Sequence, residues 1–533
     1  MQGSDWEGET VTLTTQLLVL ISLALYARAG LIALRRPMAD FYAAGRLVPA
    51  PFNGAAIAIG VVAFIALTGF AGALIQGWDG ASLLVLGAGG GMLLTAFFLA
   101  PHLRKFGGYS IPDFLGERFG GTGMRALAAA AVILCAFPAL AVALLALGAL
   151  AERLFAVDTG TGIALGLATL LLCSVVGGMR SASLTQILQY AILLAASLVV
   201  LALLFSQRGA MFPIVDAADL ANIFAGGRFE SFAAADSVNR FALFFCLAAG
   251  TMSLPHLLQR SVVTPSLEEA RMSFFWALPL AAALALVAPP YVSLLSDPGE
   301  AGAGALSSGL IIVGAIAGCL AAGSGLVLAI ANALSYDLYF KSLHLTASTE
   351  QRILVARAAV VLVAGFAAWG AIAVPETMLA ASGSAFSLAA SAFLPALLLG
   401  LWWKRATAQG ALAGMLAGLV VCLYYTLAPR YIPFAFYESS SFLSNATQEA
   451  ASRYEALRES YYLAGETGRA AALAAWEEAV RPLTNWWGVR PEFAGLFAVP
   501  IGVVTMIAVS LFTPEPSRDV QNFVEDLRTP QAV

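Results

Sequence analysis

Long apolar stretches separated by short polar segments occupy the chain from end to end. A helix needs roughly 20 mostly apolar residues to cross the hydrocarbon core of a bilayer, and about thirteen stretches meet that requirement. They lie near 11–34, 52–76, 81–101, 125–150, 160–177, 183–206, 239–259, 273–296, 306–335, 352–373, 378–402, 407–428 and 493–513. The pattern therefore predicts an all-α polytopic membrane protein.

Two of these spans are interrupted in a way that an ordinary membrane anchor is not. Residues 53–80 and 253–260 carry Gly, Ser, Thr or Pro inside an apolar run. In lipid, freed backbone groups are tolerated only where they face protein or a water-filled cavity. We therefore expect broken helices at 59–62 and 250–255 that cross beside each other halfway through the bilayer, which is the arrangement of a transporter's binding site.

The composition excludes a water-soluble globule. Hydrophobic residues make up 60% of the 533 residues, charged residues make up 11%, and the mean hydropathy is +0.84. Such a chain has too little polar surface to be solvated by water. The net charge of −4 is small, so the sequence predicts the lipid bilayer as a partner and no nucleic acid.

Cysteine and histidine give no sign of a metal centre or of catalysis. The cysteines all lie inside apolar segments and lack the close spacings of metal sites and disulfide frameworks. The histidines are scattered along the chain, which is unlike a zinc site. We expect neither a bound cofactor nor an enzyme. The residues concerned are Cys135, Cys173, Cys246, Cys319, Cys422, His102, His256 and His344.

Basic residues are concentrated in alternate loops. If the N-terminus is outside, the loops that contain HLRKFGG, GGMR and WWKR all face the cytoplasm, and the short opposite loops carry mainly Asp and Glu. The positive-inside rule favours this orientation, and an odd number of spans then places the C-terminus in the cytoplasm.

Residues 429–492 are rich in Ala, Glu and Arg, which predicts a small extracytoplasmic helical cap. An insertion without direct chemistry and a lid or docking surface remain alternatives.

Several segments, in order along the chain, carry a resemblance to a known family. They are FYAAGRLVPAPFNGAAIA at Phe41, APHLRKFGGYSIPDFLGERFG at Ala100, VVGGMRSASLTQILQYAILL at Val175, GTMSLPHLLQRSVVTPSLEEAR at Gly250, SYDLYFK at Ser335 and LFTPEPSRDVQNFVEDLRTP at Leu511. Together they resemble the sodium:solute symporter family, and particularly its acetate-permease-like bacterial branch. The resemblance covers nearly the whole chain apart from 429–492.

The resemblance implies a LeuT-type fold with a 5+5 inverted repeat in a bacterial inner membrane. A first helix and loop (1–51) would precede the first repeat (52–206), an extracytoplasmic loop (207–238) and the second repeat (239–402). A twelfth helix (403–428), the helical insertion (429–492) and a last helix with its tail (493–533) would follow. The implied activity is symport of a small organic anion, such as the short monocarboxylate acetate, and a small two-span membrane subunit is an implied partner.

The resemblance also implies where the coupling cation binds. Carbonyl groups of Ile59 and Val62 would supply oxygens, with Gly60 easing the helix break. The hydroxyl pair of sodium-dependent relatives is replaced by Ala321 and Ala322, and the nearest hydroxyl is that of Ser324. The implied cation ligands are thus Ile59, Val62, Ala321 and Ser324. Sodium is favoured over a proton, while a shifted cation site, proton coupling, uncoupled transport and a non-transporting receptor or regulatory subunit remain alternatives.

The implied substrate cavity is lined by small and polar residues of the second, third, seventh and eleventh spans. Its candidate residues are Gly60, Thr68, Gln76, Gly250, Thr251, Ser253 and Ser384, with Ser382, Ser387 and Ser391 nearby. Helix packing is the alternative role for each of them. The apolar Leu254-Pro255 favours a weakly hydroxylated solute, whose carboxylate the helix termini would hold without a buried Arg. His256 is expected to act as a gate near the cytoplasmic end, with proton transfer as the alternative.

Overall fold

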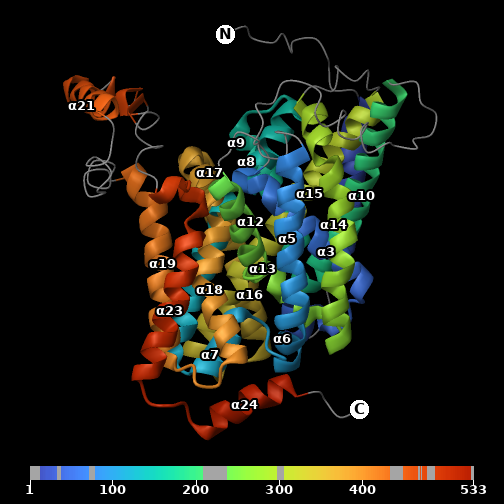
Figure 1. Ribbon diagram of the computed structural model, residues 1–533. Coiled ribbons are helices and arrows are strands. Elements are labelled where there is room, and N and C mark those ends of the chain that lie inside the picture. The colour runs from blue at the N-terminus through green and yellow to red at the C-terminus, as the bar shows by residue number, and fades with distance from the viewer. Residues whose placement is uncertain are drawn as a thin grey trace.

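The protein is a bundle of long helices that run between the same two ends of the molecule (Figure 1). The computed structural model describes residues 13–32, 38–70, 78–207, 237–296, 305–431, 448–465, 468–469, 471–473, 475–476 and 486–529. Across these residues, 10 helices are long and apolar enough to cross a membrane, and two bent helix pairs each do so as one span. With the shorter apolar helix Thr159–Ser174, these correspond to the thirteen spans predicted from the sequence.

The helices follow one another through short connections. The first half of the chain contains α1 (Leu13–Ile32), α2 (Met38–Ala43), η1 (Ala44–Arg46), α3 (Ala50–Ile65), η2 (Ala66–Phe70), α5 (Trp78–Phe98), α6 (Ala100–Phe106), α7 (Ile111–Phe119), α8 (Thr122–Phe155), α9 (Thr159–Ser174) and α10 (Gly178–Gln207). The second half contains α12 (Ser237–Thr251), α13 (Pro255–Leu258), η4 (Gln259–Val263), α14 (Leu267–Ser296), α15 (Ala305–Asn332), η6 (Ala333–Leu343), α16 (Thr349–Ala373), α17 (Pro375–Gly383), α18 (Ala385–Trp402), α19 (Ala408–Tyr431), α21 (Gln448–Leu463), η8 (Trp486–Gly488), η9 (Pro491–Phe493), α23 (Gly495–Phe512) and α24 (Arg518–Arg528).

The core of the bundle lies around α3, α15 and α18, which are enclosed on most sides by other helices. These helices are apolar around their whole circumference, as expected for helices buried inside a large bundle. The helix α3 packs against α10, α14 and α15, and α13 packs against α3 and α15. The two segments expected to cross are therefore neighbours at the centre of the protein.

The break expected at 250–255 is confirmed. The helix α12 ends at Thr251, α13 begins at Pro255, and the two form a bent pair with an angle of 44°. Pro255 has no N–H to continue the helical ladder, and Leu254 is extended. The carbonyl of Gly250 accepts hydrogen bonds from the backbone N–H groups of Ser253 and Leu254, both at 2.8 Å. This local sequence is sufficient to end α12.

The break expected at 59–62 is wrong. The helix α3 continues from Ala50 to Ile65, and the Val62 carbonyl accepts a hydrogen bond from the Ala66 N–H. A Cβ on Gly60 would lie 3.6 Å from Cδ2 of Leu257. The missing side chain of Gly60 therefore lets α13 pack close to α3. The backbone widens only in the following turn, where η2 is π-helical. Glycine alone did not break a helix that tertiary packing supports on all sides.

A helix is present in the segment predicted as an extracytoplasmic cap. Figure 1 shows α21 at the end of the bundle that carries α9 and α17, away from α7 and α24. Its sequence, QEAASRYEALRESYYL, is polar around most of its surface, as expected for a helix in water. The helical part of the prediction is confirmed, and its function as a cap stays a prediction.

Candidate functional site

Three aromatic rings mark the place where the broken helix meets α3. Phe64 of α3 lies 4.9 Å from the ring of His256 in α13 and 5.1 Å from the ring of Phe386 in α18, measured between centroids. A Cβ on Gly250 would lie only 2.8 Å from Cβ and the carbonyl oxygen of Phe386. The structure thus brings Gly60, Gly250 and His256 of the two interrupted segments together at the core of the bundle.

His256, which the sequence places near the cytoplasmic end as a gate, is enclosed by other helices. Its side chain is buried, and a Cβ on Gly325 of α15 would lie 3.7 Å from its Cδ2. Neither ring nitrogen has a hydrogen-bond partner in the part of the chain that the structure describes. The His256 side chain thus lies between α3, α15 and its own helix α13. Its function as a gate stays a prediction.

The hydroxyl groups expected to bind substrate fall into two classes. Most are engaged by backbone carbonyls: Thr68 donates to Phe64 and Ile65, Ser253 to Ala249, Ser382 to Leu379, Ser387 to Glu492 and Ser391 to Ser387. The hydroxyls of Thr251 and Ser384 are buried and have no hydrogen-bond partner among the described residues. These two are therefore the hydroxyls available to a guest. Gln76 lies outside the described residues.

A buried polar network adjoins the same helices. Gln186 of α10 donates through Nε2 to the carbonyl of Ala321, at 2.7 Å, and to Oγ of Ser324, at 3.3 Å. Ser324 in turn donates to the Ala321 carbonyl, at 3.0 Å. Arg260 of η4 donates to Oε1 of Gln186 and to Oγ of Ser183, the latter at 2.8 Å. Two of the oxygens expected to bind a cation, those of Ala321 and Ser324, are thus hydrogen-bonded to an amide.

Arg260 is held firmly although it lies in the core. Only 2% of its surface is exposed. The side-chain amide of Asn53 donates to the Arg260 carbonyl, at 2.9 Å, and to Oγ of Ser273, at 3.0 Å. Among the described residues, no ion pair includes Arg260. The network therefore places a positive charge with neutral partners in a buried part of the protein.

Sequence reasoning missed Asn53, Gln186 and Arg260. In the sequence pattern, Asn53 and Arg260 appear only as ends of the interrupted segments 53–80 and 253–260. The available signal was chemical, because polar and charged side chains inside apolar spans are expensive in lipid and usually functional. Spacing along the chain could not show that Gln186 and Arg260, which are 74 residues apart, share a hydrogen bond.

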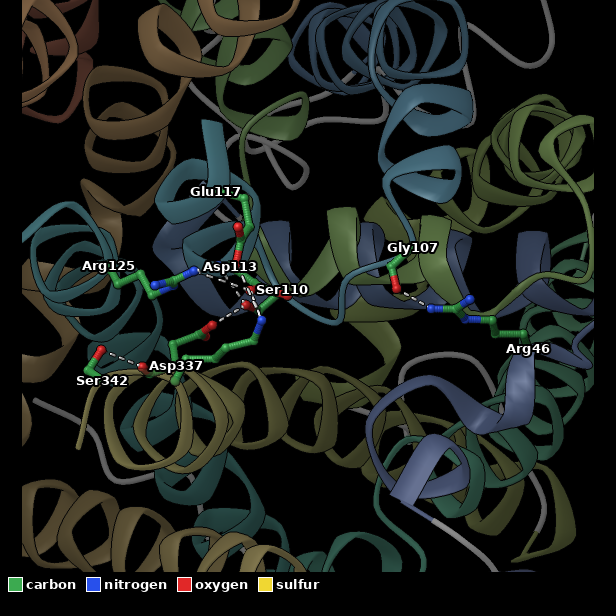
Figure 2. A network of polar contacts seen from close by, with 9 residues as sticks. Arg46, Gly107, Ser110, Asp113, Glu117, Arg125, Asp337 and Ser342 are labelled. Atoms are coloured by element: carbon green, nitrogen blue, oxygen red, sulfur yellow. Dashed lines mark hydrogen bonds and ion pairs between the residues drawn. The ribbon is translucent and has the colours of Figure 1, made fainter. Parts of the chain in front are cut away.

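A second polar network joins α7 to η6 at the end of the bundle that carries α24 (Figure 2). Ser110 is the N-cap of α7 and accepts a hydrogen bond from the Asp113 N–H at 3.0 Å. The same hydroxyl donates to Oδ1 of Asp337 at 2.6 Å. Asp337 is fully buried, and its Oδ2 has no hydrogen-bond partner among the described residues. Asp337 thus connects α7 to η6.

Charged residues surround this connection. Nζ of Lys341 lies 3.6 Å from Oδ1 of Asp113, and a terminal nitrogen of Arg125 lies 4.0 Å from the same oxygen. Both cations also pair with Glu117, at 3.4 and 2.6 Å. Burial raises the pKa of Asp113, although Lys341 and Arg125 oppose that change. The fold therefore favours the neutral form of this carboxyl more than water does.

This raised pKa gives a prediction for the Asp113→Asn protein. A carboxyl group with a higher pKa in the folded state than in the unfolded state favours folding when it is protonated. This contribution is complete below the unfolded-state pKa and is lost as the pH rises through the folded-state pKa. Asn is neutral at every pH, so the variant is expected to be at least as stable as the wild type near pH 7 and to lose that advantage toward about pH 4. Thermal unfolding at a series of pH values measures this.

Glu117→Gln is the matched control for Asp113→Asn. Glu117 contacts the same two cations from the same helix, but 45% of its side chain is exposed. Exposed ion pairs contribute about 0–1 kcal/mol, so little change is expected. An Asp113→Asn protein that is markedly less stable than the wild type at neutral pH would show that Lys341 and Arg125 outweigh burial.

Comparisons with known proteins agree with this architecture. The model of the sodium:solute symporter family matches residues 41–293 and 302–418. An uncharacterized symporter of Cupriavidus necator is 30% identical, and the match covers 95% of this chain and 92% of that protein. The monocarboxylic acid transporter of Corynebacterium glutamicum is 26% identical, and the match covers 72% of this chain and 77% of that protein.

A solved transporter shares the fold. The structure of a Na⁺-coupled sialic acid symporter, in its substrate-bound outward-open state, matches with a TM-score of 0.70 and 16% sequence identity. The match covers 95% of this chain and 99% of that chain. This likeness confirms the LeuT-type fold expected from the sequence. The family match and the long alignment with the Cupriavidus symporter show that this chain belongs to the sodium:solute symporter family.

Proposed function

We propose that this protein is a secondary active symporter that imports a short monocarboxylate, such as acetate, together with a cation. The observation that carries the proposal is the buried guanidinium of Arg260, whose hydrogen-bond partners Ser183 and Gln186 are neutral. A positive charge in a low-dielectric interior acts over a longer range than in water. It therefore favours a negatively charged guest at the neighbouring break between α12 and α13.

The groups at the break suit a small guest. Thr251 at the end of α12 and Ser384 at the start of α18 have hydroxyls without partners, and each can donate one hydrogen bond to a carboxylate. Phe386 packs against Gly250, the neighbour of Thr251 in the chain, and its ring lies 5.1 Å from the ring of Phe64, so the break is bordered by apolar groups. A sugar would need many more polar contacts than these. A short acid, with one carboxylate and a small apolar part, matches the groups present.

The relatives and the sequence complete the proposal. Similarity to a protein named a monocarboxylic acid transporter supports the substrate class. The basic loops support an N-terminus outside and a C-terminus in the cytoplasm of a bacterial inner membrane. The sequence alone favours sodium over a proton as the driving ion, and the imposed gradients described below compare the two. A small two-span membrane protein remains the proposed partner. Purification of the protein from its native membrane would test for that subunit.

Uptake by the purified full-length protein in proteoliposomes tests the function. Radiolabelled acetate, lactate, pyruvate, an amino acid and a sugar are each offered under an imposed sodium or proton gradient. We expect a short monocarboxylate to accumulate under one of these gradients, above protein-free liposomes. Thr251→Val and Ser384→Ala are expected to raise KM by roughly tenfold, because each removes a hydrogen bond to a charged group, about 1.5–3 kcal/mol.

Ser391→Ala is the matched control, because the Ser391 hydroxyl donates to the Ser387 carbonyl within its own helix. Its KM is expected to stay at the wild-type value. Accumulation of the sugar or the amino acid without any monocarboxylate would contradict the proposed substrate. Binding of a monocarboxylate without transport under any gradient would instead indicate a receptor.

A further inference from the structure

Gln186 occupies the position that a cation would need at the oxygens of Ala321 and Ser324. Its Nε2 group donates to both oxygens, at 2.7 and 3.3 Å. Only 2% of Gln186 is exposed, and Ala321 and Ser324 are fully buried. A cation at these oxygens would have to displace the amide from a closed environment.

The orientation of this amide is determined by its neighbours. Arg260 donates to Oε1 of Gln186, and a guanidinium is always protonated and only donates. If the amide were flipped, its NH₂ group would face the guanidinium and its oxygen would face the Ala321 carbonyl. Both contacts would be repulsive. Arg260 therefore holds the NH₂ group of Gln186 toward Ala321 and Ser324.

The remaining expected ligands are also engaged. Ile59 and Val62 lie in the continuous helix α3, and the Val62 carbonyl already accepts the Ala66 N–H. No carboxylate in the described residues pairs with Arg260 to offset its charge. A sodium ion needs several oxygen ligands with free lone pairs, and a fixed positive charge beside it is unfavourable. The donor set expected from the sequence does not fit sodium.

We propose that the Gln186–Arg260 pair takes the place of a bound cation at Ala321 and Ser324, and that Gln186 excludes sodium from this position. The amide supplies the hydrogen bonds and Arg260 supplies the positive charge that the ion would otherwise provide. Transport through this site then requires no sodium ion at these oxygens. The inference concerns ion selection and rests on the proposed function only where uptake is measured.

Thermal unfolding of the purified full-length protein tests the inference without any solute. An ion that binds the folded state raises the unfolding midpoint. We expect the wild type to unfold at the same temperature in sodium, potassium and choline chloride at equal ionic strength. Gln186→Glu has the same length and keeps an acceptor for Arg260, but it replaces the NH₂ donors by a carboxylate oxygen. This variant is expected to gain a sodium-specific rise in the midpoint.

Uptake provides a second measurement. Gln186→Ala removes one hydrogen-bond partner from the Ala321 carbonyl and one from the Arg260 guanidinium, so uptake is expected to fall by about tenfold. Thr185→Ala is the matched control, since the buried Thr185 hydroxyl donates to the Ser181 and Ala182 carbonyls of its own helix and, among the residues that the structure describes, to no other helix. Wild-type uptake is expected to be the same in sodium and in potassium under one proton gradient.

Two results would overturn the inference. One is a sodium-specific rise in the wild-type midpoint that Ser324→Ala removes. The other is a Gln186→Ala protein that matches Thr185→Ala in both unfolding and uptake. Failure of the proposed function gives a different result, in which no monocarboxylate is taken up in any salt while the unfolding measurements still decide whether sodium binds.

Discussion

The Arg260→Met protein is expected to lose monocarboxylate uptake by more than about tenfold and to unfold at a lower temperature than the wild type. The substitution removes the donors to Oε1 of Gln186 and Oγ of Ser183 in a buried environment. Each buried polar group left unpaired costs about 1–3 kcal/mol. The same change removes the charge that favours an anionic guest, so binding and stability fall together.

Two variants separate these effects for Arg260. Arg260→Lys keeps the charge but lacks the planar fork that reaches two acceptors, so uptake is expected to be intermediate. Arg153→Met removes an arginine whose one hydrogen bond shown by the structure is an exposed contact of 3.4 Å with the Leu295 carbonyl, and uptake is expected to remain at the wild-type rate. Uptake by Arg260→Met at the wild-type rate would show that the buried charge has no part in substrate binding.

The Gly250→Ala protein is expected to be destabilised by about 1–3 kcal/mol and to lose uptake, because it overpacks the core. The added methyl group would lie 2.8 Å from Cβ, Cδ1 and the carbonyl oxygen of Phe386. One of these atoms belongs to the backbone, so a side-chain rotation cannot relieve the contact. The helix α18 would have to move away from the break in α12, which disturbs the place where Thr251 lies.

Gly90→Ala in α5 is the matched control for Gly250→Ala. A Cβ on Gly90 meets nothing within 4 Å. Exchanging a helical glycine for alanine at an open position stabilises by about 0.5–1 kcal/mol, so the two variants are expected to shift the unfolding midpoint in opposite directions. Equal shifts for both would mean that the contact between Gly250 and Phe386 does not limit the packing of α12 against α18.

The parts of the fold that local chemistry determines were predictable from the sequence. Apolar length predicted the spans, and Pro255 with its missing N–H predicted the end of α12. The continuity of α3 at Gly60 was not predictable, because a glycine in a helix either weakens the helix or admits a close neighbour. Leu257 of α13 decides between these outcomes, and only the folded protein places it there.

The candidate site shows the same division. The resemblance selected Ala321, Ser324 and the segment that contains His256, and the structure places all three near Gln186 or α3. The amide that binds Ala321 and Ser324 comes from α10, and its orientation depends on Arg260 in η4. Side-chain hydrogen bonds between distant elements leave no periodic trace in a sequence. The chemistry of the site could therefore be read only after the helices had been assembled.

The hydroxyl of Ser110 has two simultaneous roles that differ in what they secure. As an acceptor it completes the first turn of α7, and as a donor it reaches the carboxylate of Asp337. The two roles use a lone pair and a proton, so either can end while the other persists. If η6 moves away, water can replace Asp337 as the acceptor and α7 remains wound. The contact between α7 and η6 is therefore not required for the first turn of α7 to stay capped.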